Sequence, residues 1–468
     1  MNENIFREYD IRGIVEQDLT VETVSIVARA IGTFFSRNKA KRIAVGFDAR
    51  ASSPIFRDLL VRALNSAGCD VLDIGRVPTP VLYFAVFTQD VDGGVMITGS
   101  HNPANHNGFK ICLGQATLFG EQIQAIKNIA LSRAFSPGSP TISSESFDIK
   151  AALPKIETAD VLREYQKQLL RRVTPGEKKL KVVVDAGNGM GGVTAVPLYR
   201  ALGYEIVELF TEPDSRFPNH HPDPTVTENL QDAIKAVKET GADLALAFDG
   251  DGDRIGVVDE NGRIIWGDEL MILLSRAVLR DKPNSTIIAE VKCSQNLFND
   301  IEANGGKPLM WKAGHSLIKA KMKETGAALA GEMSGHIFFA DRFYGFDDAT
   351  YAGARVLEIL SNTDLTLSEL LADLPETFST PELRVDCADE KKFAVVEKIA
   401  EEFSKTNEVI TIDGARILFE NGWGLVRASN TQAILVLRFE ADTEENLRLI
   451  RKEIENRVNY FITQIIVH

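Results

Sequence analysis

The chain has 468 residues, of which 44% are hydrophobic and 25% are charged, so it is too long for one core and has an ordinary globular composition. Its net charge of −14 disfavours nucleic acid as a partner, and it requires a local basic cluster wherever an anionic substrate binds. No basic and apolar leader begins the chain, and its apolar runs are too short to span a bilayer, so we expect no signal peptide and no membrane segment. The four cysteines lie far apart, which favours a reducing, cytoplasmic compartment without structural zinc.

The first part of the chain, residues 1–150, alternates strand-like and helix-like segments, which is the pattern of an α/β domain. The predicted elements are a helix from the N-cap Thr20 to about Arg37, strands at 42–47, 71–74 and 94–97, and helices at 54–67 and from about 80. The segment 6–13 precedes these strands, and alone it predicts a solvated turn.

A candidate nucleophile follows the strand at 94–97, in the hexapeptide Thr98-Gly99-Ser100-His101-Asn102-Pro103. Gly99 allows a sharp turn, and Pro103 ends regular structure. A serine hydroxyl needs a base or a cation to activate it, and His101 and Lys110 are close in sequence. The hexapeptide alone is equally consistent with a loop in which Ser100 is only a capping residue.

A glycine-rich turn opens the second part, which begins near residue 151 after a linker rich in serine and proline. The predicted strand 181–185 leads to Gly187–Gly192, which matches G-x-G-x-x-G, and Glu208 follows about 20 residues later, as in dinucleotide-binding sites. Because two residues separate strand and first glycine, a tight turn into a helix is the favoured interpretation, with a dinucleotide site as the alternative.

Three carboxylates alternate with glycines after the predicted strand 244–248, in Asp249-Gly250-Asp251-Gly252-Asp253-Arg254. This spacing predicts a loop around a hard cation such as Mg²⁺. An EF-hand does not fit, because Arg254 occupies the position of its required glycine. An acidic turn, or a phosphatase of the haloacid dehalogenase type with Asp249 as nucleophile, remains open.

Two polar loops follow in the last 220 residues. Glu332, Ser334 and His336 alternate on a glycine-flanked loop, which suits sugar hydroxyls as well as an ordinary polar loop. After Pro375 the pattern becomes α+β: strands at 383–386 and 432–439, helices at 390–403 and about 447–462, and hairpins at Asp413-Gly414 and Asn421-Gly422. The loop 427–431 offers a guanidinium, hydroxyls and an amide to a phosphate, although alone it predicts a hairpin turn.

Five motifs, at 7–13, 98–103, 249–254, 331–336 and 427–431, resemble those of the α-D-phosphohexomutase superfamily, and the resemblance covers the whole chain. With Met333, the motif at 331–336 resembles that of the bacterial phosphomannomutase/phosphoglucomutase group rather than that of phosphoglucosamine mutases. The chain departs from this group at Gln432-Ala433, where threonine and proline are often found. The resemblance implies an α/β fold: three similar α/β domains with mixed sheets (1–150, 151–255 and 256–368) and a C-terminal α+β domain (369–468) around a central active-site cleft.

The resemblance also implies a reaction, the reversible transfer of a phosphoryl group between C1 and C6 of mannose and glucose phosphates. It would proceed through a phosphoserine and a hexose 1,6-bisphosphate, which also serves as activator, with Mg²⁺ as cofactor. The partners would be sugar phosphates, and we expect a monomer or a weak homodimer. By position, Ser100 would carry the phosphoryl group and bind Mg²⁺ with Asp249, Asp251 and Asp253.

The remaining roles also come from the resemblance. His101 and Lys110 would transfer protons, and Tyr9, Arg12, Arg254 and Lys292 would line the phosphoryl site. Glu332 and Ser334 would hold sugar hydroxyls near His315 and His336, and Arg427, Ser429, Asn430 and Thr431 would grip the phosphate that is not reacting. The alternatives are a phosphoglucosamine mutase, a Mg²⁺-dependent phosphatase-like enzyme with Asp249 as nucleophile, a dinucleotide-dependent enzyme and a non-catalytic sugar-phosphate sensor.

Overall fold

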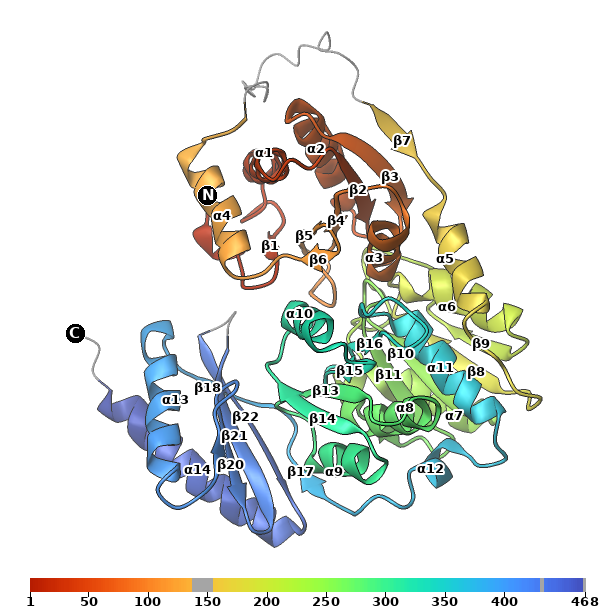
Figure 1. Ribbon diagram of the computed structural model, residues 1–468, viewed down its shortest axis with the longest axis vertical. Helices are drawn as coiled ribbons and strands as arrows, with labels where there is room; N and C mark the ends of the chain where they lie inside the picture. The colour runs from red at the N-terminus through yellow and green to blue at the C-terminus, as the bar shows by residue number, and fades with distance from the viewer. Residues whose placement is uncertain (137–154, 430–432, 466–468) are drawn as a thin grey trace.

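The computed structural model describes residues 1–136, 155–429 and 433–465, which form four sheet-based units (Figure 1). The N-terminal unit lies at the top of that view, and the chain passes through the second and third units to the C-terminal one at the lower left. In the described part of the chain, no helix is long and apolar enough to cross a membrane.

The first unit is a seven-stranded mixed sheet in the order β1-β5-β4-β2-β3-β7, with β6 paired to β5. Its elements are η1 (Glu3–Ile5), β1 (Ile11–Ile14), α1 (Val21–Arg37), β2 (Arg42–Phe47), α2 (Ser53–Ser66), β3 (Asp70–Arg76), α3 (Thr79–Thr88), β4 (Gly93–Ile97), β5 (His106–Leu113), β6 (Ala116–Thr117), α4 (Glu121–Ser132) and β7 (Ile156–Thr158). The predicted helices and strands are confirmed, including the Thr20 side chain that accepts from the amide of Thr23 at 3.2 Å. The first sheet runs past the boundary predicted at residue 150, because β7 pairs with β3.

The segment 6–13 is not a solvated turn, and that prediction was wrong. Ile11 is fully buried, and β1 pairs antiparallel with β5, so that Ile11 faces Phe109 in register. Because the residues on either side of Ile11 are charged, the sequence pattern did not indicate that Ile11 is part of the core. The pairing brings Arg12 to the edge of the sheet at which the Ser100 loop begins, where its Nη1 donates to Asn102 Oδ1 at 2.8 Å.

The second sheet has the order β12-β11-β10-β8-β9 and the third has the order β14-β13-β15-β16, and both are mixed. Their elements are α5 (Val161–Leu170), β8 (Lys181–Asp185), α6 (Gly191–Ala201), β9 (Glu205–Leu209), η2 (Thr227–Leu230), α7 (Gln231–Thr240), β10 (Leu244–Phe248), β11 (Ile255–Asp259), β12 (Ile264–Ile265), α8 (Gly267–Asp281), β13 (Thr286–Glu290), α9 (Gln295–Ala303), β14 (Lys307–Trp311), α10 (His315–Thr325), β15 (Leu329–Gly331), β16 (Ile337–Phe339), α11 (Ala349–Ser361) and α12 (Leu367–Leu370). The boundary predicted after residue 255 is too early, because β11 and β12 complete the second sheet. The boundary predicted after residue 368 falls within α12.

The C-terminal unit is a six-stranded sheet in the order β17-β22-β21-β20-β19, with β18 also on β22, and two long helices, as the α+β prediction requires. Its elements are β17 (Phe378–Ser379), β18 (Leu383–Asp386), α13 (Asp389–Phe403), β19 (Val409–Ile410), β20 (Ala415–Phe419), β21 (Gly422–Ala428), β22 (Ile434–Ala441) and α14 (Glu444–Gln464). Both hairpins form, and Ile450, Ile454 and Val458 of α14 are buried as predicted.

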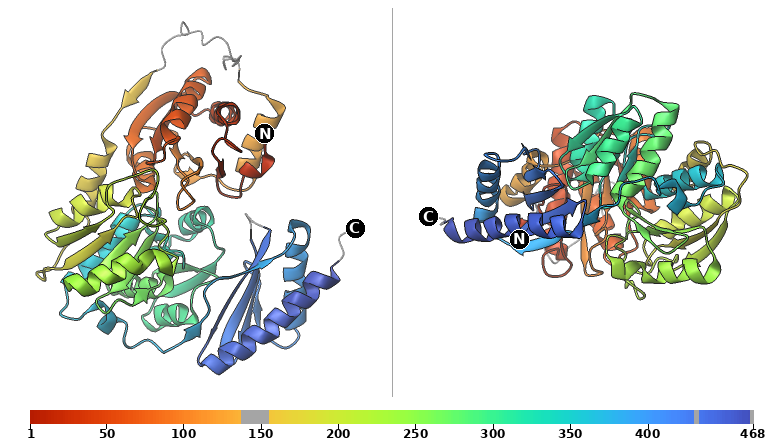
Figure 2. Two further views of the ribbon diagram at one scale, coloured as in Figure 1. Left: turned by 180° about the vertical axis from the view of Figure 1, so that it is seen from behind. Right: turned by 90° about the horizontal axis from the view of Figure 1, so that it is seen from below.

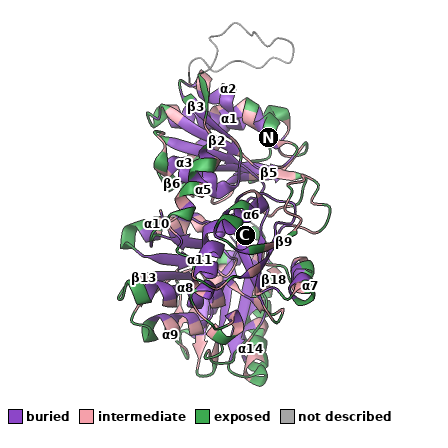
Figure 3. Cartoon of the chain, turned by 90° about the vertical axis from the view of Figure 1, so that its right-hand side faces the viewer, coloured by how far each residue is buried: buried purple, intermediate pink, exposed green. Residues whose placement is uncertain are grey.

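One hydrophobic cluster extends through the first three units but does not enter the fourth. One buried cluster joins α3 of the first unit to α5, α6 and α11, with Tyr83, Tyr165, Tyr199 and Tyr351 among its members. The C-terminal unit has its own cluster and meets the third unit in a small one of Val291, Trp423 and Leu425. Views from behind and below show the C-terminal unit set to one side (Figure 2), and Figure 3 shows buried strands beneath helices with exposed outer faces. Polar contacts add to this junction, since Arg416 donates to the carbonyls of Val291 and Cys293 and Arg438 pairs with Asp268.

Candidate active site

Ser100 lies three residues beyond the end of β4, at the carboxyl edge of the first sheet, and is almost fully buried. Its backbone is left-handed, with φ of 49°, a conformation that L-residues other than glycine rarely adopt and that often marks a functional site. Its Oγ donates to Asp249 Oδ2 at 3.1 Å and lies 3.3 Å from His101 Nδ1. The fold therefore joins two motifs that are 149 residues apart.

The three aspartates lie in the loop between β10 and β11, and all three are fully buried. One carboxylate oxygen from each lies within 4.8 Å of the others. The loop is held by Asp249 Oδ1, which accepts from the amides of Asp253 and Arg254 at 3.0 and 3.1 Å. Glycines at 250 and 252 permit this closure, and Gly252 has a φ of 74°.

The donor set fits a hard divalent cation. Asp251 Oδ1 and Asp253 Oδ1 are buried without a hydrogen-bond partner, which is costly unless a cation binds them. Burial, together with the charges of Asp251 and Asp253, raises the pKa of Asp249 well above its ordinary value. A bound cation would remove this repulsion, so a hard divalent cation suits both the geometry and the charge of the loop.

Lys110 projects from β5 into the same loop. Its Nζ contacts Asp251 Oδ2 at 2.7 Å and also bonds to Asp253. Burial opposes its charge, but Asp251 and Asp253 outweigh burial and raise the pKa of Lys110 above its ordinary value. Lys110 is therefore a charged ammonium group in this arrangement, able to donate hydrogen bonds but not to act as a base.

The imidazole of His101 differs from Lys110 in charge. Burial lowers the pKa of His101 well below its ordinary value, and the guanidinium groups of Arg254 and Arg12 add to the effect. A neutral imidazole thus lies beside the Ser100 hydroxyl, with one nitrogen able to accept a proton.

His336 belongs with the aspartate loop rather than with an open sugar pocket. The Nε of Arg254 donates to His336 Nε2 at 2.9 Å, so we assign the ring proton to Nδ1, which lies 3.1 Å from Asp347 Oδ2. Asp253, His336 and Asp347 also bring three ligand atoms within 4.8 Å. Because Arg254 occupies one ring nitrogen and the other carries the proton, this second group does not suit a metal ion.

The loops predicted to hold the sugar meet the first unit from the third. Glu332 Oε1 accepts from the amide of Gly314 at 2.7 Å, and Ser334 lies half-buried two residues later. Tyr9 reaches across from the first unit and donates to the carbonyl of Ala313 at 3.1 Å. His315 follows Gly314, and its ring lies 5.9 Å from that of Tyr9. Residues from two of the predicted motifs, at 7–13 and 331–336, thus both contact the segment 313–315.

Two predicted phosphate ligands form a separate basic cluster at the junction of the third and fourth units. Arg427 Nη2 pairs with Asp413 at 3.1 Å, and Lys292 Nζ pairs with Glu382 at 3.2 Å. The charge of Arg427 also acts on Lys292, so the two cations are close. Lys292 therefore lies near Arg427, and its expected role at the phosphoryl site stays a prediction. Ser429 follows β21, whereas Asn430 and Thr431 lie outside the described residues.

Several residues of the site were not predicted from the sequence. Thr79, at the start of α3, donates to Asp251 Oδ2 at 2.5 Å, and Asp347 faces His336. Asp48 and Arg50 follow β2, the strand next to β4, and support the Ser100 loop. Since ligands gather at the carboxyl ends of neighbouring parallel strands, this last pair was within reach of topological reasoning.

The glycine-rich turn at 187–192 packs against the aspartate loop. The amide of Met190 donates to the carbonyl of Gly250 at 2.9 Å, and a Cβ on Gly191 would lie 2.4 Å from Phe248. Glu208 pairs with Arg200 on the surface. Close packing against Phe248 and against Gly250 of the aspartate loop thus accounts for Gly191 and Gly189, which leaves the dinucleotide alternative without support.

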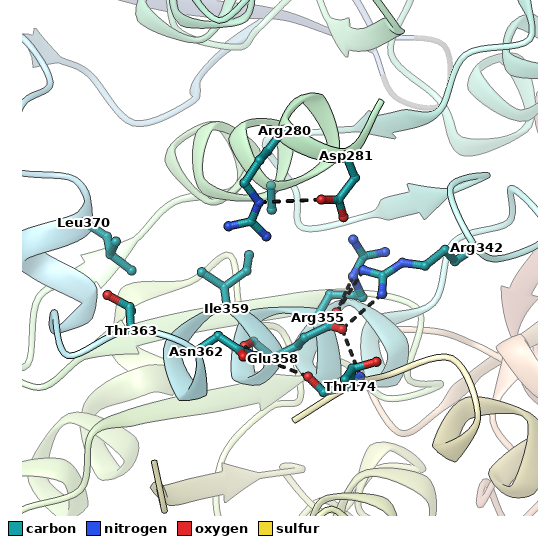
Figure 4. A pocket seen from close by; sticks show the side chains of 11 residues that line it. Thr174, Arg280, Asp281, Arg342, Arg355, Glu358, Ile359, Asn362, Thr363 and Leu370 are labelled. Carbon is teal, nitrogen blue, oxygen red and sulfur yellow. Dashed lines mark hydrogen bonds and ion pairs between the residues drawn. The ribbon is translucent and has the colours of Figure 1, made fainter. Parts of the chain in front are cut away.

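A cavity of about 620 Å³ lies away from these residues, at the carboxyl ends of α8 and α11 (Figure 4). Its charged side chains pair with one another, since Glu358 receives both Nη groups of Arg342 at 3.0 Å and lies 3.0 Å from Arg355 Nε. None of the predicted site residues lines it.

Models of all four domains of phosphoglucomutase/phosphomannomutase match the chain: domain I at residues 3–136, domain II at 163–262, domain III at 266–378 and the C-terminal domain at 382–457. The chain belongs to the phosphoglucomutase/phosphomannomutase family. It is therefore an enzyme of the phosphohexomutase class, and the four-unit fold implied by the resemblance is confirmed.

Individual relatives agree over nearly their full length. The chain is 49% identical to the phosphomannomutase/phosphoglucomutase of Pseudomonas putida over 451 residues, covering 96% of this chain and 94% of the relative. It is 45% identical to a phosphoglucomutase of Neisseria gonorrhoeae, covering 96% and 95%. A crystal structure of a family protein from Burkholderia thailandensis superposes with a TM-score of 0.91 at 42% identity, covering 100% of this chain and 99% of the other.

Proposed function

We propose that the enzyme interconverts the 1-phosphates and 6-phosphates of glucose and mannose by way of phosphorylated Ser100 and a bound hexose 1,6-bisphosphate. The observation that carries the proposal is the Ser100 hydroxyl, 3.1 Å from Asp249 Oδ2 at a loop of three buried carboxylates. A phosphoserine that donates its group to one end of the sugar and accepts it from the other allows both ends to use one site. The bisphosphate would also act as activator, because it restores phosphate to an empty Ser100.

Asp249, Asp251 and Asp253 are the residues that would hold Mg²⁺, together with an oxygen of the Ser100 phosphate. The bound ion would supply neutralisation of the charge that develops on the transferring phosphoryl group. The Lys110 ammonium contacts Asp251, and the Arg254 guanidinium interacts with Asp249 and Asp253, so both add positive charge there.

In the first transfer, the bond between phosphorus and Ser100 Oγ breaks, and a bond from phosphorus to a sugar hydroxyl oxygen forms. The hydroxyl proton leaves to a base, and the serine oxygen takes up a proton. Neutral His101, 3.3 Å from Ser100 Oγ, suits the exchange at the serine, and the protonated Lys110 is a second donor. The second transfer reverses these bonds at the other end of the sugar.

The bisphosphate must turn over between the two transfers while it stays bound. Arg427, with Lys292 beside it and with Ser429, Asn430 and Thr431 following, would grip the phosphate that is not reacting. The separate core of the C-terminal unit allows that grip to loosen and close as a rigid body. We further propose that the enzyme acts in the cytoplasm as a monomer or a weak homodimer.

The proposal is tested by locating the phosphate. Intact-mass analysis of the purified protein, after incubation with glucose 1,6-bisphosphate, should find a fraction one phosphate heavier, with the label on Ser100. A phosphoserine survives acid and hydroxylamine, whereas an acyl phosphate on Asp249 is destroyed by both. A labile phosphate on Asp249 would contradict the proposal and favour the phosphatase-like alternative.

Sugar preference is tested at Glu332. The chain resembles relatives named phosphoglucomutase and relatives named phosphomannomutase/phosphoglucomutase. We therefore expect mannose 1-phosphate and glucose 1-phosphate both to be substrates. Glu332→Gln should keep the contact with Gly314 but weaken hydrogen bonds to hydroxyls, raising KM for both sugars about tenfold. A coupled assay with these two 1-phosphates and glucosamine 1-phosphate measures the effect.

Glu324→Gln, at an exposed position of α10, is the matched control and should leave both KM values unchanged. Turnover of glucosamine 1-phosphate alone would show that the loop 331–336 was wrongly assigned.

Arg427→Ala tests the phosphate grip. Because Arg427 would contact the 6-phosphate of one substrate and the 1-phosphate of the other, KM should rise by similar factors in both directions. A charge-assisted hydrogen bond contributes roughly 1.5–3 kcal/mol, so we expect an increase of about 10- to 100-fold. More 1,6-bisphosphate should also escape into solution, as measured by its release during steady-state turnover.

Arg448→Ala, at an exposed position on α14, controls for charge in the same unit and should have neither effect. An increase of KM in one direction only would contradict a grip shared by both phosphates.

A further inference from the structure

The loop that carries Ser100 closes around a single buried guanidinium, that of Arg50, whose residue is 2% exposed. Its Nη1 donates to the carbonyls of Pro103 and His106 at 2.5 and 2.9 Å. Its Nη2 donates to the carbonyls of Ser100 and Asn102 at 2.8 and 2.6 Å. Four carbonyls of one loop thus converge on one side chain, and no lysine could bond to them all.

Asp48 completes this arrangement from the other side. Its Oδ2 accepts from Arg50 Nε and from the amide of Gly99, both at 3.2 Å, so the fifth guanidinium donor is also used. Its Oδ1 accepts from Ser53 Oγ at 2.6 Å. A Cβ on Gly99 would lie 2.5 Å from the guanidinium carbon, which explains the glycine immediately before the nucleophile. The arginine at position 50 therefore requires a glycine at position 99.

The same carbonyl that Arg50 holds at Ser100 faces the aspartate loop. A Cβ on Gly250 would lie 2.4 Å from the Ser100 carbonyl oxygen, so the two loops touch backbone to backbone. The ring of Phe217, from the second unit, lies 5.3 Å from the guanidinium carbon. Arg50 therefore fixes the nucleophile loop at the point where it meets the residues proposed to bind the metal.

We propose that Arg50 is a positioning residue for phosphoryl transfer: it holds Ser100 in its left-handed conformation, with Oγ directed at the aspartate loop, and so determines the rate of transfer rather than the affinity for sugar. The inference rests on the proposed function of Ser100. Arg50 acts only through the loop backbone, because all five of its donors are bonded to carbonyls or to Asp48. Its loss should displace the nucleophile without touching the proposed phosphate grip at Arg427.

Arg50→Lys is the decisive variant. It keeps the charge but replaces five fixed donors with one ammonium, so the loop loses most of its carbonyl contacts. A displacement of about 1 Å costs on the order of 100-fold in rate, and we expect kcat to fall by about that factor while KM stays within about threefold of wild type. Phosphorylation of Ser100 by glucose 1,6-bisphosphate, followed by intact mass over time, should slow by a similar factor.

Arg355→Lys is the matched control, because Arg355 is an equally buried arginine with ion pairs to Asp341 and Glu358 in the third unit. It should lower the unfolding temperature without reducing kcat per folded molecule. If Arg50→Lys does not fold, Asp48→Asn tests the same arrangement more mildly, since it removes the charge that orients Arg50, and kcat should fall about tenfold at unchanged KM.

A folded Arg50→Lys enzyme with kcat within threefold of wild type would overturn the proposal, as would an equal loss of kcat in Arg355→Lys. If Arg50→Lys does not fold, Asp48→Asn with wild-type kcat would overturn it as well. A wild-type enzyme that carries its phosphate on a residue other than Ser100 would instead contradict the proposed function itself. The site of phosphorylation and the kinetics of the variants therefore separate the two failures.

Discussion

Ser100→Ala should reduce turnover by at least about 10⁴-fold, because it removes the atom that accepts and donates the phosphoryl group. The variant deletes one buried oxygen and leaves the backbone contacts of the loop to Arg50 and Thr98 in place. The protein should therefore fold, bind sugar phosphate and show no mass increase with glucose 1,6-bisphosphate. Stopped or continuous coupled assays give the rate, and intact mass gives the phosphate content.

Ser275→Ala is a matched control, since it removes one buried hydroxyl from α8, where Ser275 bonds only to the carbonyl of Ile272 among its described contacts. It should keep wild-type kcat and remain able to accept phosphate. Turnover of Ser100→Ala above about one percent of wild type would show that another group carries the phosphate, with Asp249 as the first candidate.

The net charge of the chain makes the local cations of the site necessary. A sugar phosphate approaches a molecule with a formal charge of −14, and three of its carboxylates are buried at the proposed site of phosphoryl transfer. Arg12 and Arg254 both lie near His101, and Lys292 and Arg427 lie near each other in a second basic cluster. Each phosphate of the proposed bisphosphate thus has a cation-rich position, which supports a single intermediate held at both ends.

Regular elements with one unbroken apolar run were predictable from the sequence. The strands 181–185 and 244–248 occur with the predicted bounds, because each is buried on both faces and ends abruptly at glycine or aspartate. The strand at 11–14 was missed, because only its alternate residues are buried and its neighbours are charged. The sheet boundaries were also misplaced, since β7, β11 and β12 join strands that precede them in the chain.

The site was only partly predictable, for a different reason. The chemistry of the aspartate loop follows from its spacing, but its contact with Ser100 joins two sheets and depends on tertiary packing. Motif resemblance supplied that pairing. Arg50 had no motif of its own, because an arginine acquires this role only when a loop closes around it. Lys292 likewise had no signal in its sequence neighbours for its pairing with Glu382 and its place near Arg427.

Removal of metal should abolish activity, and Asp251→Asn should come close to doing so. The loop offers three carboxylates, and loss of one charge weakens cation binding and the stabilisation of the transferring group, which is worth several kcal/mol. We expect kcat to fall by about 10²- to 10⁴-fold. EDTA should abolish the activity of the wild-type enzyme, and excess Mg²⁺ should restore that activity fully. The Asp251→Asn variant should need a higher Mg²⁺ concentration and should recover only part of its activity.

Thermal unfolding provides a measurement of binding that does not depend on turnover. Because a ligand that binds only the folded state stabilises it, Mg²⁺ should raise the unfolding temperature of the wild type in proportion to the logarithm of its concentration, once binding saturates. The shift should be much smaller for Asp251→Asn, whereas Asp58→Asn, at an exposed position of α2, should match the wild type. Full activity in excess EDTA, or an unchanged Mg²⁺ shift in Asp251→Asn, would show that the buried oxygens of this loop bind no catalytic cation and that Lys110 alone balances their charge.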